Sequence, residues 1–358
     1  MALASSRLVW RGALRCFFFC CLWVLVQLLP LVSAAGRPLV ITSELFAQRH
    51  VPRGYHPECP ERIAAILKGP LAESDAGAKY EIRKPSAESD DAARAAALAA
   101  IRLAHTDEYV KEVKMRCEKG ARALSPWDSD TYLSPDTFDT CVLAQSAWLD
   151  GVQHVSSSTS STSSRFAFAV TRPPGHHAER ESGMGFCIFN FAAAAALHAV
   201  ESKLAKRVAI LDIDVHYGNG VASIVEHDER IRYASLHQEG IFPNPPPTDG
   251  VQPGPHKNVL TVNLKAGFRG PEFLSALKER ALPFLSELGA DLVIICAGFD
   301  ALASEELANG GLRPDDFADI SALIKQGFPN TGVLYGLEGG YELKGMPLAL
   351  EAAVRPWL

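Results

Sequence analysis

The stretch RVAILDIDVH, residues 207–216, decides the fold class of this chain. Its first half is an unbroken apolar run, as in a strand buried on both faces of a parallel sheet, and its second half is charged. Because side chains alternate along a strand, Asp212, Asp214 and His216 are expected on one side. Burying two carboxylates and an imidazole there without a cation would be costly. The stretch therefore predicts a metal site at a strand end, against the simpler alternative of a solvated, acid-capped strand.

Similar runs rich in Val, Ile and Leu recur along the chain and alternate with longer helical patterns. This alternation is typical of an α/β fold with a mostly parallel central sheet flanked by helices. Strands are predicted at 38–42, 166–171, 207–214, 231–236, 259–264, 291–297 and 332–337, and helices at 61–71, 91–103, 137–155, 191–206, 271–288, 314–327 and 344–354. Since no repeat or linker interrupts the pattern, residues 37–358 are expected to form one domain.

The composition also limits what the protein can do. Hydrophobic residues make up 47% and charged residues 21% of 358 residues, which excludes a mainly disordered or collagen-like chain. The formal net charge is -6 and there is no run of Lys and Arg, so direct nucleic-acid binding is not expected. The cysteines form no CxxC pair, which excludes a zinc ribbon and favours free thiols.

Residues 1–35 differ from the rest and are expected to be a signal peptide or signal anchor. Arg7, Arg11 and Arg15 precede an apolar run, and small residues around Ala34 offer a cleavage site. A retained anchor is the alternative, because the apolar run is just long enough to span a bilayer. We therefore expect a secretory or endomembrane location, with no membrane contact in the mature form unless the leader is retained. A mitochondrial or plastid presequence is the other reading.

A second acidic residue stands at the end of another predicted strand. Asp300 follows the strand at 291–297, as Asp214 follows its own. By itself, an Asp after a Gly at a strand end is more typical of a turn or helix cap. With Asp214 and His216 it would supply the three protein ligands that a catalytic zinc site uses, leaving one position open.

Two further motifs follow strands. His176 and His177 come after the strand at 166–171 on a stiff Pro-Pro-Gly turn, and each ring needs its own partner. Beside a catalytic metal such a pair can serve as general base and general acid, whereas alone it would be a solvated turn. Tyr341 follows the last strand after two glycines, and this turn could aim its hydroxyl into the same site.

Together, these motifs make the sequence similar to the histone deacetylase family, nearest its class II and bacterial-type acetylpolyamine amidohydrolase branches. The similarity runs from about Pro38 to the C-terminus, and its landmarks are the segments at 56–62, 172–178, 185–187, 212–220, 235–237, 297–301 and 339–341. It implies a three-layer fold of the arginase and deacetylase type, one catalytic zinc ion and a tunnel sized for acetyl-lysine. The implied reaction is zinc-dependent removal of acetyl groups from acetylated proteins or peptides, or from acetylpolyamines.

The resemblance also assigns roles position by position. Zinc would be held by Asp214, His216 and Asp300, while His176 and His177 would be the acid–base pair and Tyr341 would polarise the acetyl carbonyl. The substrate stem would pass between Phe186 and Phe242, next to Gly185.

Two supporting residues follow from the same comparison of positions. Asp212 would orient His176, and with the Ser235 region it could serve a structural K⁺ site of the family. Asn219 stands where one branch of the family has an Asp beside the second histidine. An amide fixes the tautomer of that ring but stabilises an imidazolium less than a carboxylate would. Phe191 replaces a more usual Asn, which puts the packing of that loop in question.

Two rival functions remain open on these residues. A two-manganese ureohydrolase of the related arginase fold needs further carboxylates, and the segment Asp300-Ala301-Leu302 lacks the second Asp. An inactive acyl-binding module is the other rival, although none of the ligand, histidine or tyrosine positions is degraded. The sequence does not indicate the natural substrate or an oligomeric state.

Overall fold

The computed structural model describes residues 36–72, 79–125, 128–157, 164–244 and 247–358, and the predicted leader lies outside these ranges. Within them, a nine-stranded sheet forms the centre in the order β2-β1-β5-β11-β10-β6-β7-β9-β8, and every neighbouring pair is parallel except β8 and β9. None of the described helices is both long and apolar enough to cross a membrane.

The strands of this sheet are short, and those in its centre are buried along their whole length. They are β1 (Leu39–Ile41), β2 (Glu81–Arg83), β5 (Phe166–Ala169), β6 (Val208–Asp212), β7 (Ile231–Gln238), β8 (Gly250–Val251), β9 (Val259–Leu264), β10 (Leu292–Ala297) and β11 (Gly332–Leu337). A separate antiparallel pair is formed by β3 (Ala123–Ser125) and β4 (Asp128–Tyr132).

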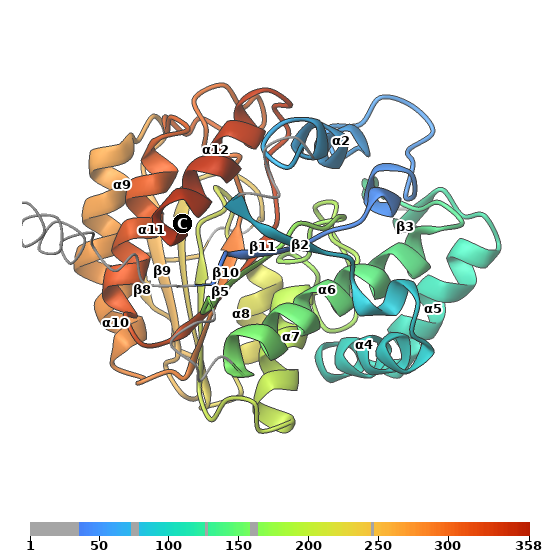
Figure 1. Ribbon diagram of the computed structural model, residues 1–358, viewed down its shortest axis with the longest axis horizontal. Helices are drawn as coiled ribbons and strands as arrows, with labels where there is room; N and C mark the ends of the chain where they lie inside the picture. The colour runs from blue at the N-terminus through green and yellow to red at the C-terminus, as the bar shows by residue number, and fades with distance from the viewer. Residues whose placement is uncertain (1–35, 73–78, 126–127, 158–163, 245–246) are drawn as a thin grey trace, which may run out of the picture.

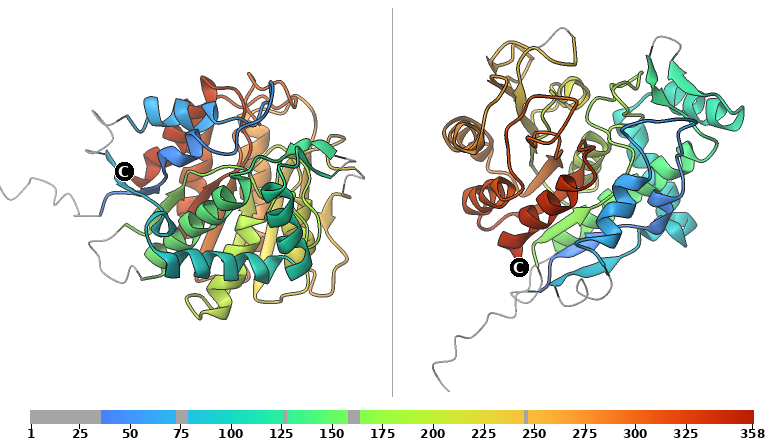
Figure 2. Two further views of the ribbon diagram at one scale, coloured as in Figure 1. Left: turned by 90° about the vertical axis from the view of Figure 1, so that its right-hand side faces the viewer. Right: turned by 90° about the horizontal axis from the view of Figure 1, so that it is seen from above.

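Helices cover the sheet on both faces, which gives three layers (Figure 1). They are α2 (Glu61–Lys68), α4 (Asp91–Ala104), α5 (Asp107–Glu118), α6 (Thr137–Ser157), α7 (Phe191–Glu201), α8 (Asn219–Val225), α9 (Gly270–Ala276), α10 (Leu282–Ser286), α11 (Asp316–Gly327) and α12 (Gly345–Val354). Helices α4, α6 and α7 lie on one side of the sheet and α9 to α12 on the other, as the rotated views also show (Figure 2).

Small residues let the helices lie close to the sheet. Helix α7 has five consecutive alanines, residues 192–196, and all five are buried, so the helix can lie close to the strands. In β11 a Cβ atom at Gly336 would overlap the indole ring of Trp148 from α6, so only glycine fits there. Such close packing of apolar side chains on both faces explains why the central strands read as continuous hydrophobic runs.

The predicted α/β class is confirmed, and each of the seven predicted strands and seven predicted helices has a counterpart, although several of their ends differ. Strand β6 ends at Asp212, so the predicted strand end at Asp214 is wrong by two residues, and Asp214 and His216 lie in the segment that follows the strand. The helix predicted at 191–206 stops at Glu201, and the one predicted at 271–288 is interrupted by a π-helical turn at Leu277–Ala281. The predictions did not include α5, α8, the edge strands β2 and β8, or the pair β3–β4.

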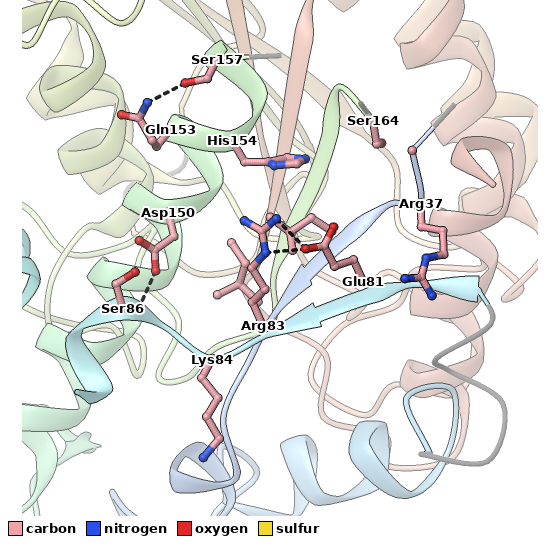
Figure 3. A pocket seen from close by; sticks show the side chains of 13 residues that line it. Arg37, Glu81, Arg83, Lys84, Ser86, Asp150, Gln153, His154, Ser157 and Ser164 are labelled. Carbon is pink, nitrogen blue, oxygen red and sulfur yellow. Dashed lines mark hydrogen bonds and ion pairs between the residues drawn. The ribbon is translucent and has the colours of Figure 1, made fainter. Parts of the chain in front are cut away.

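A cavity of about 620 Å³ lies at the β1–β2 edge of the sheet, against the C-terminal half of α6 (Figure 3). It is lined by charged side chains that pair locally: Arg83 bonds to Glu81, and Asp150 accepts the backbone N–H of Ser86. None of the residues singled out from the sequence lies in this cavity.

Candidate active site

Five neighbouring strands end at one edge of the sheet, where parallel strands place their carboxyl ends together. The segments that follow β5, β11, β10, β6 and β7 carry the predicted metal ligands, the two tandem histidines, Tyr341 and the predicted tunnel residues, while Asp212 is the last residue of β6. Residues far apart in sequence therefore meet at a single place, and the topology explains why each motif followed a predicted strand.

Asp214, His216 and Asp300 form a compact triad whose possible ligand atoms all lie within 4.8 Å of one another. Nδ1 of His216 is 3.1 Å from Oδ1 of Asp214 and 3.0 Å from Oδ2 of Asp300. Among the residues that the structure describes, this is the group of three or more His, Cys, Asp or Glu side chains able to hold a metal ion.

Backbone amides aim both carboxylates of the triad. Asp214 accepts the N–H of Gly339 on Oδ2 at 2.9 Å, and Asp300 accepts the N–H of Val215 on Oδ1 at 2.9 Å. In each case the other oxygen faces His216. These bonds fix the carboxylates before any cation binds, which is the support that metal ligands need.

The triad carries negative charge that only imidazoles balance. Within the described ranges, no Lys or Arg forms an ion pair with the carboxylate of Asp214 or Asp300, and both carboxylates are buried. Burial together with Asp214 raises the pKa of Asp300 to about 6. Burial opposes a charge on His216 as well, but Asp214 and Asp300 raise the pKa of that ring to about 10. Such an environment favours a cation.

The two tandem histidines are held differently. Nδ1 of His176 lies 3.0 Å from Oδ2 of Asp212, whereas Nδ1 of His177 lies 2.8 Å from Oδ1 of Asn219. Although burial lowers the pKa of His176, Asp214 and Asp212 raise it to about 10. For His177, burial is joined by the neighbouring His176 and His216, and its pKa falls well below the usual value. The charges around the two rings therefore shift their pKa values in opposite directions.

Tyr341 lies on the turn after β11, and its ring is enclosed by two neighbours. The guanidinium of Arg62 sits 4.8 Å from the ring centroid, and Phe186 packs edge-on at 5.5 Å. Arg62 also donates from Nε to the carbonyl of Gly340 at 2.7 Å. Burial raises the pKa of Tyr341 well above its usual value, so its hydroxyl remains a proton donor.

The predicted tunnel residues pack against the histidine and tyrosine side chains of the site. Phe242, which is 39% exposed, packs its ring edge-on against His177 with centroids 4.8 Å apart. Gly185 has φ of 57°, and a Cβ there would come within 2.7 Å of the His177 ring and 2.8 Å of the Phe242 ring. Only glycine gives both rings this room. Phe186 has φ of 70°, a strained conformation that Thr131 supports by accepting its N–H.

Two of the sequence landmarks, the segments at 56–62 and 172–178, are joined by a buried ion pair for which no role was predicted. Arg172 donates from Nε and Nη2 to the two oxygens of Glu58 at 2.8 and 2.7 Å, and both side chains are fully buried. Although burial favours a neutral carboxyl, Arg172 holds the pKa of Glu58 well below its usual range. In the sequence, only the run of charged and Pro residues at 56–62 indicates this network.

Other predicted contacts can be placed as well. Asp212 uses one oxygen for both His176 and the hydroxyl of Tyr233, and the other for the N–H of Asp214. Ser235 bonds to His237, and the K⁺ site expected near it stays a prediction. The question about Phe191 is answered, because this side chain is fully buried at the start of α7.

The triad of two carboxylates and an imidazole could hold a metal ion, and beside it lie two histidines with opposite pKa shifts and a tyrosine hydroxyl. Such a set of groups suits amide hydrolysis. The family model described as the histone deacetylase domain matches residues 56–356. The chain therefore belongs to the histone deacetylase family, whose members are deacetylases that hydrolyse amide C–N bonds.

Individual relatives agree with this assignment. The chain is 38% identical to an uncharacterised protein of Synechocystis, over 87% of this chain and 96% of that protein. It is 32% identical to the polyamine deacetylase HDAC10 of Mus musculus, over 81% of this chain but only 43% of that protein. The solved HDA15 HD domain superposes with a TM-score of 0.76 at 28% identity, covering 90% of each chain. The fold is thus that of a histone deacetylase domain.

Proposed function

We propose that this chain is a zinc-dependent deacetylase that hydrolyses the acetyl amide of acetyl-lysine in proteins or of acetylated polyamines. The observation that carries the proposal is the convergence of Asp214, His216 and Asp300 within 4.8 Å at the carboxyl ends of parallel strands. Membership of the deacetylase family supports the reaction class. The metal and the roles of the individual residues are part of the proposal.

The donor set fits zinc. Two carboxylate oxygens and one imidazole nitrogen are ligands that zinc accepts, and three protein ligands are typical of catalytic rather than structural sites. Asp300 keeps Oδ1 on a backbone N–H, which leaves its Oδ2 for a cation. Asp214 accepts a backbone N–H on each oxygen, so a cation would share Oδ1 with the N–H of His216. When bound, zinc would supply a Lewis acid for the acetyl oxygen and would lower the pKa of water.

The two histidines divide the proton transfers. Asn219 donates its amide N–H to Glu179, so its Oδ1 accepts from Nδ1–H of His177, and Nε2 of that ring is left to receive a proton from the attacking water. His176 donates its Nδ1–H to Asp212 and carries a second proton on Nε2. We propose His177 as the general base and His176 as the cation that stabilises developing negative charge and supplies the proton to the leaving amine.

Tyr341 would donate its hydroxyl to the acetyl oxygen as that oxygen becomes negative. Its enclosure by Arg62 and Phe186 excludes water from one side of the reacting centre. The rings of Phe186 and Phe242 would hold the methylene stem that lysine and polyamines share. This shared stem is why the site by itself suits both kinds of acetylated amine.

A relative's name favours testing polyamines first. The similar HDAC10 proteins are named polyamine deacetylases, although this chain spans less than half of their length. The test is turnover of an acetyl-lysine peptide and of acetylspermidine by the zinc-loaded protein, with zinc content measured on the same sample. Turnover of neither substrate by a folded protein with zinc bound would reject the proposal.

A further inference from the structure

The turn that carries Tyr341 is held by a carboxylate that no motif had marked. Oε2 of Glu305 accepts the backbone N–H of Tyr341 at 2.7 Å and that of Glu342 at 3.2 Å. Glu305 is half-buried, while the adjacent Glu306 is exposed. Two consecutive amides bonded to a single carboxylate oxygen make a strong, charge-assisted clamp.

The clamp joins two loops of the site. Glu305 lies five residues after the metal-ligand position Asp300, on the segment that follows β10, whereas Tyr341 lies on the segment that follows β11. A second contact runs in parallel, since the hydroxyl of Ser304 donates to Glu342 at 3.4 Å. Within the described residues, no Lys or Arg side chain pairs with Glu305, so its charge is directed at the turn.

Other groups hold the peptides of Gly339 and Gly340, but none of them bonds to the N–H of Tyr341. The carbonyl of Gly339 accepts from Phe299 and its N–H donates to Asp214, while the carbonyl of Gly340 accepts from Arg62. Gly340 has φ of 112°, a conformation that glycine reaches with little resistance. After Gly340, the carboxylate of Glu305 holds the backbone N–H groups of Tyr341 and Glu342.

The histidine turn uses the same device. Oε2 of Glu338, which is fully buried, accepts the N–H groups of Gly175 and His176 at 2.6 and 3.1 Å. Each of the two turns that carry proton-transferring side chains is thus held by one carboxylate that receives two successive amides.

We propose that Glu305 is a positioning residue for the reaction, which fixes the Tyr341 hydroxyl by clamping the amides of Tyr341 and Glu342. The inference rests on the proposed function, in which that hydroxyl polarises the acetyl oxygen. Because the hydroxyl is at the far end of the side chain, a small rotation at Gly340 displaces it further than the backbone itself. Misplacement of a catalytic group by about 1 Å can cost ~10² in rate.

Kinetics of matched variants test the inference. Glu305→Ala should lower kcat by ~10–100-fold with little change in KM, while Glu305→Gln, which keeps an acceptor oxygen, should stay within about threefold of wild type. Glu306→Ala is the control and should behave as wild type. In a Tyr341→Phe background the hydroxyl is gone, so adding Glu305→Ala should change kcat by less than about twofold. If Glu305→Ala lowered kcat by the same factor with and without the Tyr341 hydroxyl, or changed KM alone, the positioning role would be overturned.

Amide hydrogen exchange separates this inference from the proposed function, because it needs no substrate. In the wild-type and Glu306→Ala proteins, the amides of Tyr341 and Glu342 should be protected, and in Glu305→Ala they should exchange at least ~10-fold faster while the central strands stay protected. Equal exchange in all three proteins would reject the clamp even if the enzyme is an active deacetylase. Faster exchange in Glu305→Ala than in the wild type, together with a wild-type protein that has no deacetylase activity, would support the clamp and reject the proposed reaction.

Discussion

Two clusters of buried carboxylates lie beneath and within the same site, and they are balanced in opposite ways. Glu58 is met by the guanidinium of Arg172 on both oxygens, with a further bond from the hydroxyl of Tyr132. Asp214 and Asp300 are met by backbone amides and by imidazoles, and by no Lys or Arg of the described chain. The first cluster has arginine as its cation, whereas the second has only imidazoles within the described chain and could hold a metal ion.

This difference separates a structural role from a chemical one. A buried pair with its own cation loses stability when one partner is removed. A buried carboxylate pair that is balanced only by imidazoles can exchange their protons for a metal ion, because a ligand imidazole must be neutral. The two clusters should therefore respond to substitution in different measurements, the first in unfolding and the second in metal content and turnover.

The largest effect is expected at the triad. Asp214→Ala, His216→Ala and Asp300→Ala should each lower zinc occupancy and reduce turnover by more than ~10², because loss of a ligand should cost more than loss of a group that merely supports one. Metal analysis and a deacetylation assay on the folded variants check this. Full zinc content in all three would remove the metal assignment.

The second effect concerns the complete cluster. Arg172→Met should lower the free energy of unfolding by ~3–5 kcal/mol, since it removes the cation that binds both oxygens of the buried Glu58 and leaves only the longer 3.4 Å contact from Arg62 as an ion pair with a permanent cation. Urea unfolding of the purified protein measures it. The double variant with Glu58→Gln should recover part of the loss, and the folded fraction of either should still bind zinc. Equal losses in the single and double variants would argue against an ion pair.

The third effect is confined to the reaction. Tyr341→Phe should keep the fold and the metal but cut kcat by ~10²–10³, because one hydroxyl donor to the developing oxyanion is lost. Substrate binding should change little, whereas Phe186→Ala should mainly weaken binding. A zinc-loaded Tyr341→Phe enzyme with normal kcat would show that this tyrosine only shapes the turn.

The smallest effect tests the asymmetry of the histidines. Asn219→Asp places a carboxylate beside His177 and should raise the pKa of that ring by about one unit or more. Because a general base is inactive when protonated, the acid limb of the profile of kcat/KM against pH should move to higher pH. An unmoved limb would mean that His177 is not the base whose titration sets it.

The sequence predicted the central strands well because their apolar runs are buried on both faces, as in β6 and β10. It also predicted which residues meet, since parallel strands bring their ends together. What it missed depends on contacts between distant segments: the Arg172–Glu58 pair joins residues 114 positions apart, and the Glu305 clamp joins residues 36 apart. Nor does a local pattern indicate the strained φ of Phe186, which neighbouring loops impose.

The most direct test of the central claim is to titrate zinc into metal-free protein while following both bound metal and deacetylation. The account predicts that turnover rises in step with occupancy and reaches its plateau at one zinc ion per chain, as three protein ligands in a single triad require. A plateau only at two ions, as in a binuclear ureohydrolase, or tight binding of one zinc with no turnover of any acetylated amine, as in an inactive acyl-binding module, would contradict it.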